Sequence, residues 1–149
     1  MKYLNKSLKG KESLKLTRRG YFKTKNFTST QCTVEGQETY WYACNIDADY
    51  VLDEQGFLID HNNIHKAIKR HIKHHPMYSC EVMSRTLAHI TGNMLVKYGC
   101  IIKSIDFTII PVDKELLIKN TEGNLVAKDP LKMNFLMPAN ATYKLILNE

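Results

Sequence analysis

Residues 39–51 alternate between two kinds of side chain, and this alternation constrains the fold more than any other feature of the sequence. Successive side chains of a β-strand point to opposite faces of the sheet, so every second residue shares a face. One face would carry the apolar and aromatic set, Tyr40, Tyr42, Cys44, Ile46, Ala48 and Tyr50, and the other would carry Thr39, Trp41, Asn45, Asp47 and Asp49. The segment is predicted to be a strand with one buried face, which other elements must cover.

Two amphipathic helices are predicted after this strand, and they can supply the cover. Isoleucines recur four residues apart within residues 62–74, which places them on one face of a helix, and Asp60 is a candidate N-cap. A second apolar stripe runs from Ser79, another candidate cap, to Tyr98, and Gly99 is a natural residue for the C-terminal cap. Both helices can therefore pack on the buried face of the strand.

Further strands are predicted on both sides of the helices. A weaker pattern before residue 39 suggests a partner for the first strand, residues 101–110 alternate clearly, and a Gly-containing turn suggests a hairpin. The predicted segments are residues 14–27, 101–110, 116–119 with 125–128, and 142–147. This order of elements predicts an α+β fold, in which an antiparallel sheet carries both helices on one face.

Positive charge is concentrated near the start of the chain. The net charge of the 149 residues is +6, but residues 1–25 hold nine basic side chains against Glu12 alone, a balance of +8. This segment is interpreted either as a solvated basic arm or as a surface that contacts phosphate. Because no aromatic platform of the RNA-binding type accompanies the lysines, a nucleic-acid partner is not expected.

The cysteines and the hydropathy pattern indicate in which cellular compartment the protein is expected. The four cysteines form no CxxC pair, which favours reduced thiols in a cytosolic setting over a disulfide framework. No apolar run approaches the roughly 20 residues that a membrane helix needs, and no apolar segment follows the basic start as in a secretory signal. A cytoplasmic protein without a membrane partner is therefore expected.

Three segments stand out by their order and spacing: residues 42–60, Ser79-Cys80-Glu81 and residues 99–110. Together they resemble the tunnelling-fold family, which includes 6-pyruvoyltetrahydropterin synthase and 6-carboxytetrahydropterin synthase. Residues 42–60 resemble the second strand, the following turn and the start of the first helix of that family. Ser79-Cys80-Glu81 resembles the opening of its second helix, and residues 99–110 resemble its third strand. The resemblance covers about residues 20–112 of a single domain, 1–149, leaving a basic arm at 1–19 and an additional C-terminal hairpin and strand at 113–149.

The resemblance implies an assembly and a ligand. Family protomers pack side by side into a barrel with a central tunnel, and a purine or pterin is expected at the boundary between protomers. A homo-oligomer with such a small-molecule partner is therefore expected here. The residues placed at the ligand by the resemblance are Tyr40, Glu38, Ser79, Cys80, Glu81 and Asp113. Glu81 is expected to be a buried carboxylate that accepts hydrogen bonds from ring N–H groups.

The zinc site of the family is missing from this sequence. The family pattern C-x3-H-G-H-x-Y aligns with residues 32–40, where Cys32 and Tyr40 remain but Gly36 and Glu38 replace both histidines. No histidine precedes His61, so the third zinc ligand also lacks a counterpart. Since catalytic zinc needs about three protein ligands, neither a metal nor another cofactor is expected.

Three functions remain open at this point. The leading hypothesis is an oligomeric binding protein for a purine-, pterin- or nucleotide-like small molecule, without the zinc chemistry of the family. The first alternative is a divergent enzyme of the carbon–oxygen lyase type, in which Cys32 acts with one of the histidines. The second is a structural or interaction protein that retains only the fold.

The histidines and two strand residues allow simpler interpretations. His61 with His65, and His71 with His75, are four residues apart, so each pair shares a helix face that could hold a metal or could simply be solvated or line a tunnel. Cys44 lies on the apolar strand face and is expected in the core. Trp41 lies on the opposite face, where it packs between protomers or stacks on a ligand.

Overall fold

Four antiparallel strands form the main sheet of the molecule, in the order β1-β2-β3-β6. The structure, a computed structural model, describes residues 13–24, 39–49, 60–75, 79–132 and 141–147. The strands are β1 (Ser13–Lys23), β2 (Thr39–Asp49), β3 (Ile102–Pro111) and β6 (Ala141–Ile146). The predicted pairing of the first strand with residues 39–51 is confirmed. Residues 14–19, which the sequence placed both in this strand and in the basic arm, belong to β1.

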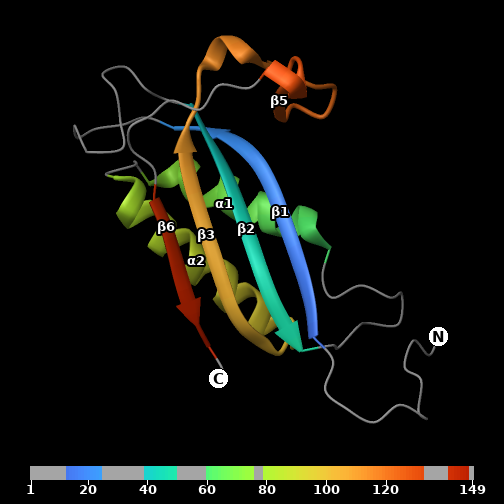
Figure 1. Cartoon of the computed structure of the whole chain (residues 1–149), viewed down its shortest axis with the longest axis vertical. Helices are drawn as coiled ribbons and strands as arrows, with labels where there is room; N and C mark the ends of the chain where they lie inside the picture. The colour runs from blue at the N-terminus through green and yellow to red at the C-terminus, as the bar shows by residue number, and fades with distance from the viewer. Residues whose placement is uncertain (1–12, 25–38, 50–59, 76–78, 133–140, 148–149) are drawn as a thin grey trace, which may run out of the picture.

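Both helices cover the same face of this sheet, as Figure 1 shows. They are α1 (His61–His74) and α2 (Cys80–Lys97). The predicted caps are confirmed, because the Asp60 side chain accepts a hydrogen bond from the Asn62 backbone N–H and Ser79 accepts one from that of Val82. Gly99 follows α2 with a φ of +82°, a conformation that glycine adopts without strain. No helix in the described part of the chain has both the length and the apolarity needed to cross a bilayer.

The helix-covered face of the sheet forms the core. The predicted apolar face of β2 is confirmed over its described residues, since each of these side chains is at most 1% exposed: Tyr40, Tyr42, Cys44, Ile46 and Ala48. Phe107 and Ile109 of β3 lie fully buried beside them. The α+β class, with an antiparallel sheet and two helices on one face, is therefore as predicted.

The opposite face of the sheet is mainly polar, apart from the row that contains Trp41. One row of residues crosses all four strands in register, from Thr17 through Asn45 and Asp106 to Lys144. The Thr17 hydroxyl donates to Asn45 Oδ1 over 2.7 Å, and Lys144 Nζ lies 3.7 Å from an Asp106 carboxylate oxygen. The polar side chains of this row therefore satisfy one another across the strands.

A separate two-stranded hairpin stands beyond the end of β3. It consists of β4 (Leu117–Lys119) and β5 (Leu125–Ala127), and short 3-10 helices flank it at Lys114–Leu116 and Pro130–Lys132. The two strands pair antiparallel, so the predicted hairpin is confirmed, and Gly123 in its turn has a φ of +79°. Figure 1 shows the hairpin above the C-terminal end of β1, whereas β6 returns to pair with β3.

The cysteines differ from the sequence-based expectation in one respect. Cys44 is fully buried in the core, as predicted, and burial raises the pKa of its thiol to about 12. Cys44 and Cys100 are not in disulfide bonds, but Cys80 is disulfide-bonded. The expectation that the cysteines are all reduced is therefore wrong, because two residues distant in sequence can be adjacent in the fold without any CxxC spacing.

Candidate functional site

A cavity of about 610 Å³ lies between the end of β1, the exposed side of α1 and the β4–β5 hairpin. Its lining includes five cationic side chains, Lys23, Lys69, Arg70, Lys73 and Lys119. None of the described residues that line it is acidic. This cavity, the basic pocket, is therefore a region of positive electrostatic potential on the molecule.

Three elements bring these cations together. Lys69 and Lys73 are four residues apart on α1, so their side chains lie on one helix face. Lys23 is the last residue of β1, and Lys119 is the last residue of β4. The basic pocket therefore depends on the way the hairpin, the helix and the edge of the sheet meet, since no short segment of sequence contains all of these residues.

A buried histidine on α1 also lines the basic pocket. His65 is 6% exposed, and its Nδ1 atom lies 2.6 Å from the Tyr42 hydroxyl of β2. Burial, followed by the positive charges of Arg18 and Lys69, lowers the pKa of His65 to about 4. Burial also raises the pKa of Tyr42, so both partners of this hydrogen bond are uncharged at neutral pH.

Gly20 makes room for this arrangement. Gly20 is the β1 partner of Tyr42 in the strand register, and the two residues share the helix-covered face. A Cβ atom at position 20 would lie 2.8 Å from Tyr42 Cε1 and 3.0 Å from the Tyr42 hydroxyl, closer than real Cβ contacts allow. The absence of a side chain at Gly20 therefore lets the Tyr42 ring extend over β1 to reach His65.

The hairpin is joined to α1 by Asn124. Lys69 Nζ donates to Asn124 Oδ1 over 3.2 Å. The Asn124 side chain also acts on His65, whose pKa it raises slightly against the stronger effect of burial. The turn that holds Asn124 is organised by Asn120, whose Oδ1 accepts from the backbone N–H groups of Glu122 and Asn124. Hydrogen bonds therefore connect α1 to the core through Tyr42 and to the hairpin through Asn124.

The residues that the family resemblance placed at a ligand do not line the basic pocket where they are described. Tyr40 is fully buried, its ring stacks on Phe22 at a centroid distance of 5.4 Å, and burial raises its pKa to about 12. Ser79 caps α2, and Asp113 caps a 3-10 helix by accepting from the Glu115 backbone N–H. These two side chains therefore have local structural roles.

The start of α2 corrects one expectation. Glu81 was expected to be a buried carboxylate, but it is exposed in the first turn of the helix, next to the buried and disulfide-bonded Cys80. A carboxylate at this position stabilises the helix N-terminus through the helix dipole. Cys32 and Glu38, together with the rest of the segment aligned with the zinc pattern, lie outside the described residues, so their roles stay predictions.

The histidines divide by burial. His65 is buried, so the interpretation of a uniformly solvated or tunnel-lining histidine face is wrong for this residue. The rings of His71 and His75 stack with centroids 4.3 Å apart, and burial, followed by the charge of His75, lowers the pKa of His71. Among the described residues, no group of three or more His, Cys, Asp and Glu side chains is placed to hold a metal ion.

No family model, no curated protein and no solved structure matches this chain. The described sheet and helices are compatible with a tunnelling fold, but the resemblance to that family stays a prediction. The function therefore has to be inferred from the basic pocket and its surroundings.

Proposed function

We propose that the protein binds a phosphorylated purine-, pterin- or nucleotide-like small molecule in the basic pocket, without zinc chemistry. The observation that carries this proposal is the set of five cationic side chains around one cavity whose described lining contains no carboxylate. Like charges gathered around a cavity repel one another, and a bound anion removes that repulsion. A phosphate group is suited to this role because it carries about two negative charges and three strong acceptor oxygens.

The rest of the lining supports a ring attached to the phosphate. Phe22, Ile72 and Leu125 give the pocket an apolar wall, and Tyr21 adds a second aromatic side chain. Pockets for small molecules combine such walls with a few polar groups that fix orientation, in volumes of roughly 300–1,000 Å³. A cavity of about 610 Å³ has room for more than a phosphate alone, which favours a phosphorylated ring compound over inorganic phosphate.

His65 gives the ring end of such a ligand an uncharged neighbour. At neutral pH its low pKa keeps the imidazole neutral, and the hydrogen bond with Tyr42 holds the ring in place. The aliphatic and aromatic wall and this neutral group can contact the heterocycle while the lysines contact the phosphate. The proposed division of the pocket therefore has one cationic region and one uncharged region.

Calorimetry with AMP and adenosine tests the proposal directly. AMP is expected to bind more tightly than adenosine, and its affinity should fall between about 50 mM and about 500 mM salt because exposed charges are screened. Lys73→Ser should weaken AMP binding about tenfold, the effect of losing one charge-assisted hydrogen bond. Lys66→Ser is the matched control, since Lys66 is exposed on the same helix but does not line the pocket.

Equal affinities for AMP and adenosine would contradict the proposal. Equal losses from Lys73→Ser and Lys66→Ser would also contradict it, because they would show only a general attraction of the basic surface for anions. A short single-stranded oligonucleotide that binds far more tightly than AMP would replace the small-molecule ligand with a nucleic acid.

Self-association is proposed on a separate observation. β1 and β6 are the edge strands of the described four-stranded sheet, and edge strands readily pair with strands of other chains. We propose that these edges join protomers, as the resemblance to barrel-forming proteins implies. Native mass spectrometry of the purified chain is expected to report an oligomer, and a strictly monomeric species would contradict this part of the proposal.

A further inference from the structure

The β4–β5 hairpin forms one wall of the basic pocket, and we propose that a bound anion clamps this hairpin onto α1. The inference rests on the proposed function of the same pocket and adds a conformational response to it. Lys119, Gly123 and Leu125 of the hairpin line the cavity together with Lys69 and Lys73 of α1. A ligand in the cavity therefore contacts both elements at once.

The hairpin is built to move more easily than the main sheet. It forms a two-stranded sheet of its own, with three residues in each strand, and two-stranded hairpins are at best marginally stable in isolation. The hydrogen bond from Lys69 Nζ to Asn124 Oδ1, which joins the hairpin to α1, lies in an exposed position. Local opening of such an element requires less free energy than unfolding of the core.

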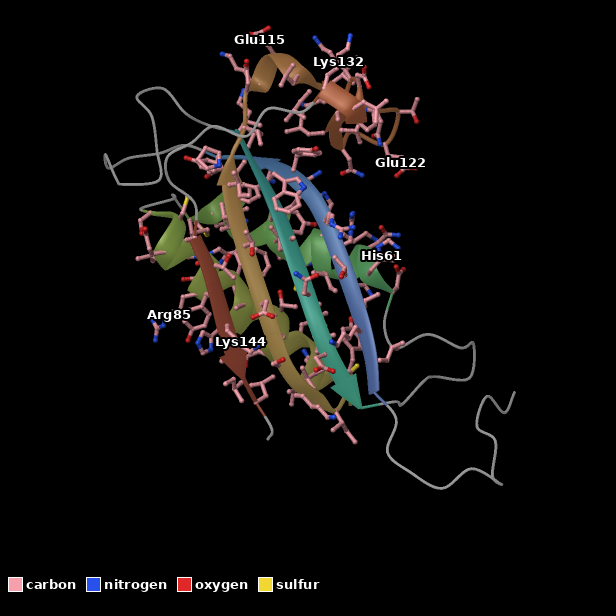
Figure 2. The ribbon with its side chains drawn as sticks, viewed as in Figure 1. His61, Arg85, Glu115, Glu122, Lys132 and Lys144 are labelled. Carbon is pink, nitrogen blue, oxygen red and sulfur yellow. The ribbon has the colours of Figure 1, made fainter. Side chains whose placement is uncertain are left out.

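Electrostatic repulsion opposes closure of the empty pocket. Lys119 approaches from the hairpin, and Lys69 and Lys73 approach from α1, so like charges face a common cavity. Glu122 lies at the tip of the hairpin (Figure 2), where it is exposed and does not line the cavity. The nearest hairpin carboxylate in the sequence therefore does not neutralise Lys119 inside the pocket.

An anion bound between the hairpin and α1 replaces the repulsion between their lysines with attraction. A phosphate that accepts hydrogen bonds from Lys73 on one side and Lys119 on the other attracts both, so closing the hairpin becomes favourable. The open form lacks the wall made by Lys119, Gly123 and Leu125, and it therefore binds the ligand more weakly. A ligand that prefers the closed form shifts the equilibrium toward it by that difference in affinity.

Amide hydrogen exchange of the full chain, followed by mass spectrometry, measures this closure. At an AMP concentration about ten times its dissociation constant, exchange in residues 117–127 should slow about tenfold if the open form does not bind AMP. Residues 102–111 of β3 serve as an internal reference, because they lie in the centre of the main sheet and should change little. Adenosine, which lacks the phosphate, should protect the hairpin much less than AMP at the same occupancy.

Three variants separate the contributions to the clamp. Asn124→Ala should speed exchange of the hairpin in the absence of ligand, because it removes the hydrogen bond to Lys69. Lys119→Ser should abolish most of the protection given by AMP while leaving AMP binding on the α1 side measurable. Lys128→Ser is the matched control, since Lys128 follows the same hairpin but is exposed and does not line the cavity.

The two proposals fail in different ways. If calorimetry shows that AMP binds but residues 117–127 exchange at the same rate with and without it, the clamp is wrong and the binding site stands. The clamp is also wrong if Lys119→Ser is protected as strongly as the natural chain. If AMP does not bind the natural chain at all, both the proposed function and the clamp are wrong.

Discussion

The two helices lie on the same face of the sheet, but they have different relations to it. α2 buries eight residues, all of them apolar, small or hydroxyl-bearing, and it packs against β3 and β6. α1 buries four residues, and one of these is the ionisable His65. The side of α1 that carries Lys69 and Lys73 lines the basic pocket. α2 therefore completes the core, whereas α1 is shared between the core and the candidate site.

This difference shows where a small α+β layer can accommodate a binding site. A helix that is closely packed against the sheet leaves no room for a ligand, because the space around its buried side chains is already filled. A helix near an edge strand can bury one face and present the adjacent face to a cavity. The comparison predicts that changes on α2 alter stability, and that changes on the pocket side of α1 alter binding.

The largest effect is expected in the centre of α2. Leu87 is fully buried, so Leu87→Ala should lower the free energy of unfolding by about 3 kcal/mol through lost apolar contacts and a residual cavity. Val96→Ala, on the same helix but at a side chain that is 59% exposed, should cost less than about 0.5 kcal/mol. Denaturant titration of both variants measures the difference. Similar losses from both would show that α2 is not the main core helix.

The next largest effect on stability is expected at low pH and arises from protonation of His65. Its folded pKa of about 4 is below the ordinary histidine value of 6.5, so the unfolded chain binds a proton more readily between these values. Stability should therefore fall as the pH drops from about 6.5 to about 4, by up to about 3 kcal/mol from this group, with no further loss from it below that range. Unfolding titrations across this pH range should show a smaller loss in His65→Gln. His74→Gln, at an exposed histidine, should keep the loss seen in the natural chain.

Two glycines, one beside the candidate site and one in α2, should differ in how an added methyl group affects stability. Gly20→Ala should cost about 1–3 kcal/mol, because the new Cβ atom would overlap the rigid Tyr42 ring and displace it from His65. At Gly92 of α2 the nearest atom to a new Cβ is the mobile end of the Leu145 side chain at 3.3 Å. Gly92→Ala should therefore be near neutral, or stabilising by up to about 1 kcal/mol, since alanine favours the helix. Thermal unfolding would contradict this contrast if both variants were equally destabilised.

The smallest effect on stability is expected at the pocket lysines. Lys73→Ser should change the free energy of unfolding by less than about 0.5 kcal/mol, because Lys73 is exposed, and removal of one of several like charges offsets part of any loss. The same variant is expected to weaken AMP binding, so the two measurements should separate. A large loss of stability in Lys73→Ser would mean that this side of α1 is structural, and the contrast between the helices would disappear.

Much of the fold could be predicted from local patterns. The alternation in residues 39–51 identified the buried face of β2, and Asp60, Ser79 and Gly99 marked the helix ends, because caps and periodicity depend on neighbours in the sequence. The turn before Leu125 identified the hairpin for the same reason. These features are local, so a single sequence is sufficient to find them.

The candidate site could not be predicted in the same way. Lys23, Lys69 and Lys119 are far apart in the sequence, and only the packing of the hairpin on α1 brings them to one cavity. His65 looked like one of several solvated histidines, because its burial depends on Tyr42 and on the space left by Gly20. The exposure of Glu81 was missed because the expectation came from a family resemblance, which does not fix the surroundings of a side chain in this chain.

The order of the strands has a practical consequence for redesign of the protein. The chain leaves the sheet at the end of β3 and returns as β6 on the neighbouring strand position, where Ala141 pairs with Ile109. The end of β3 and the start of β6 are therefore neighbours in the sheet, and joining them by a short turn would preserve the strand order (Figure 1). The hairpin, which forms one wall of the basic pocket, can thus be replaced without changing the order of the strands. Grafting loops of other lengths and charges at this point would change what the pocket accepts while the four-stranded layer keeps its connectivity.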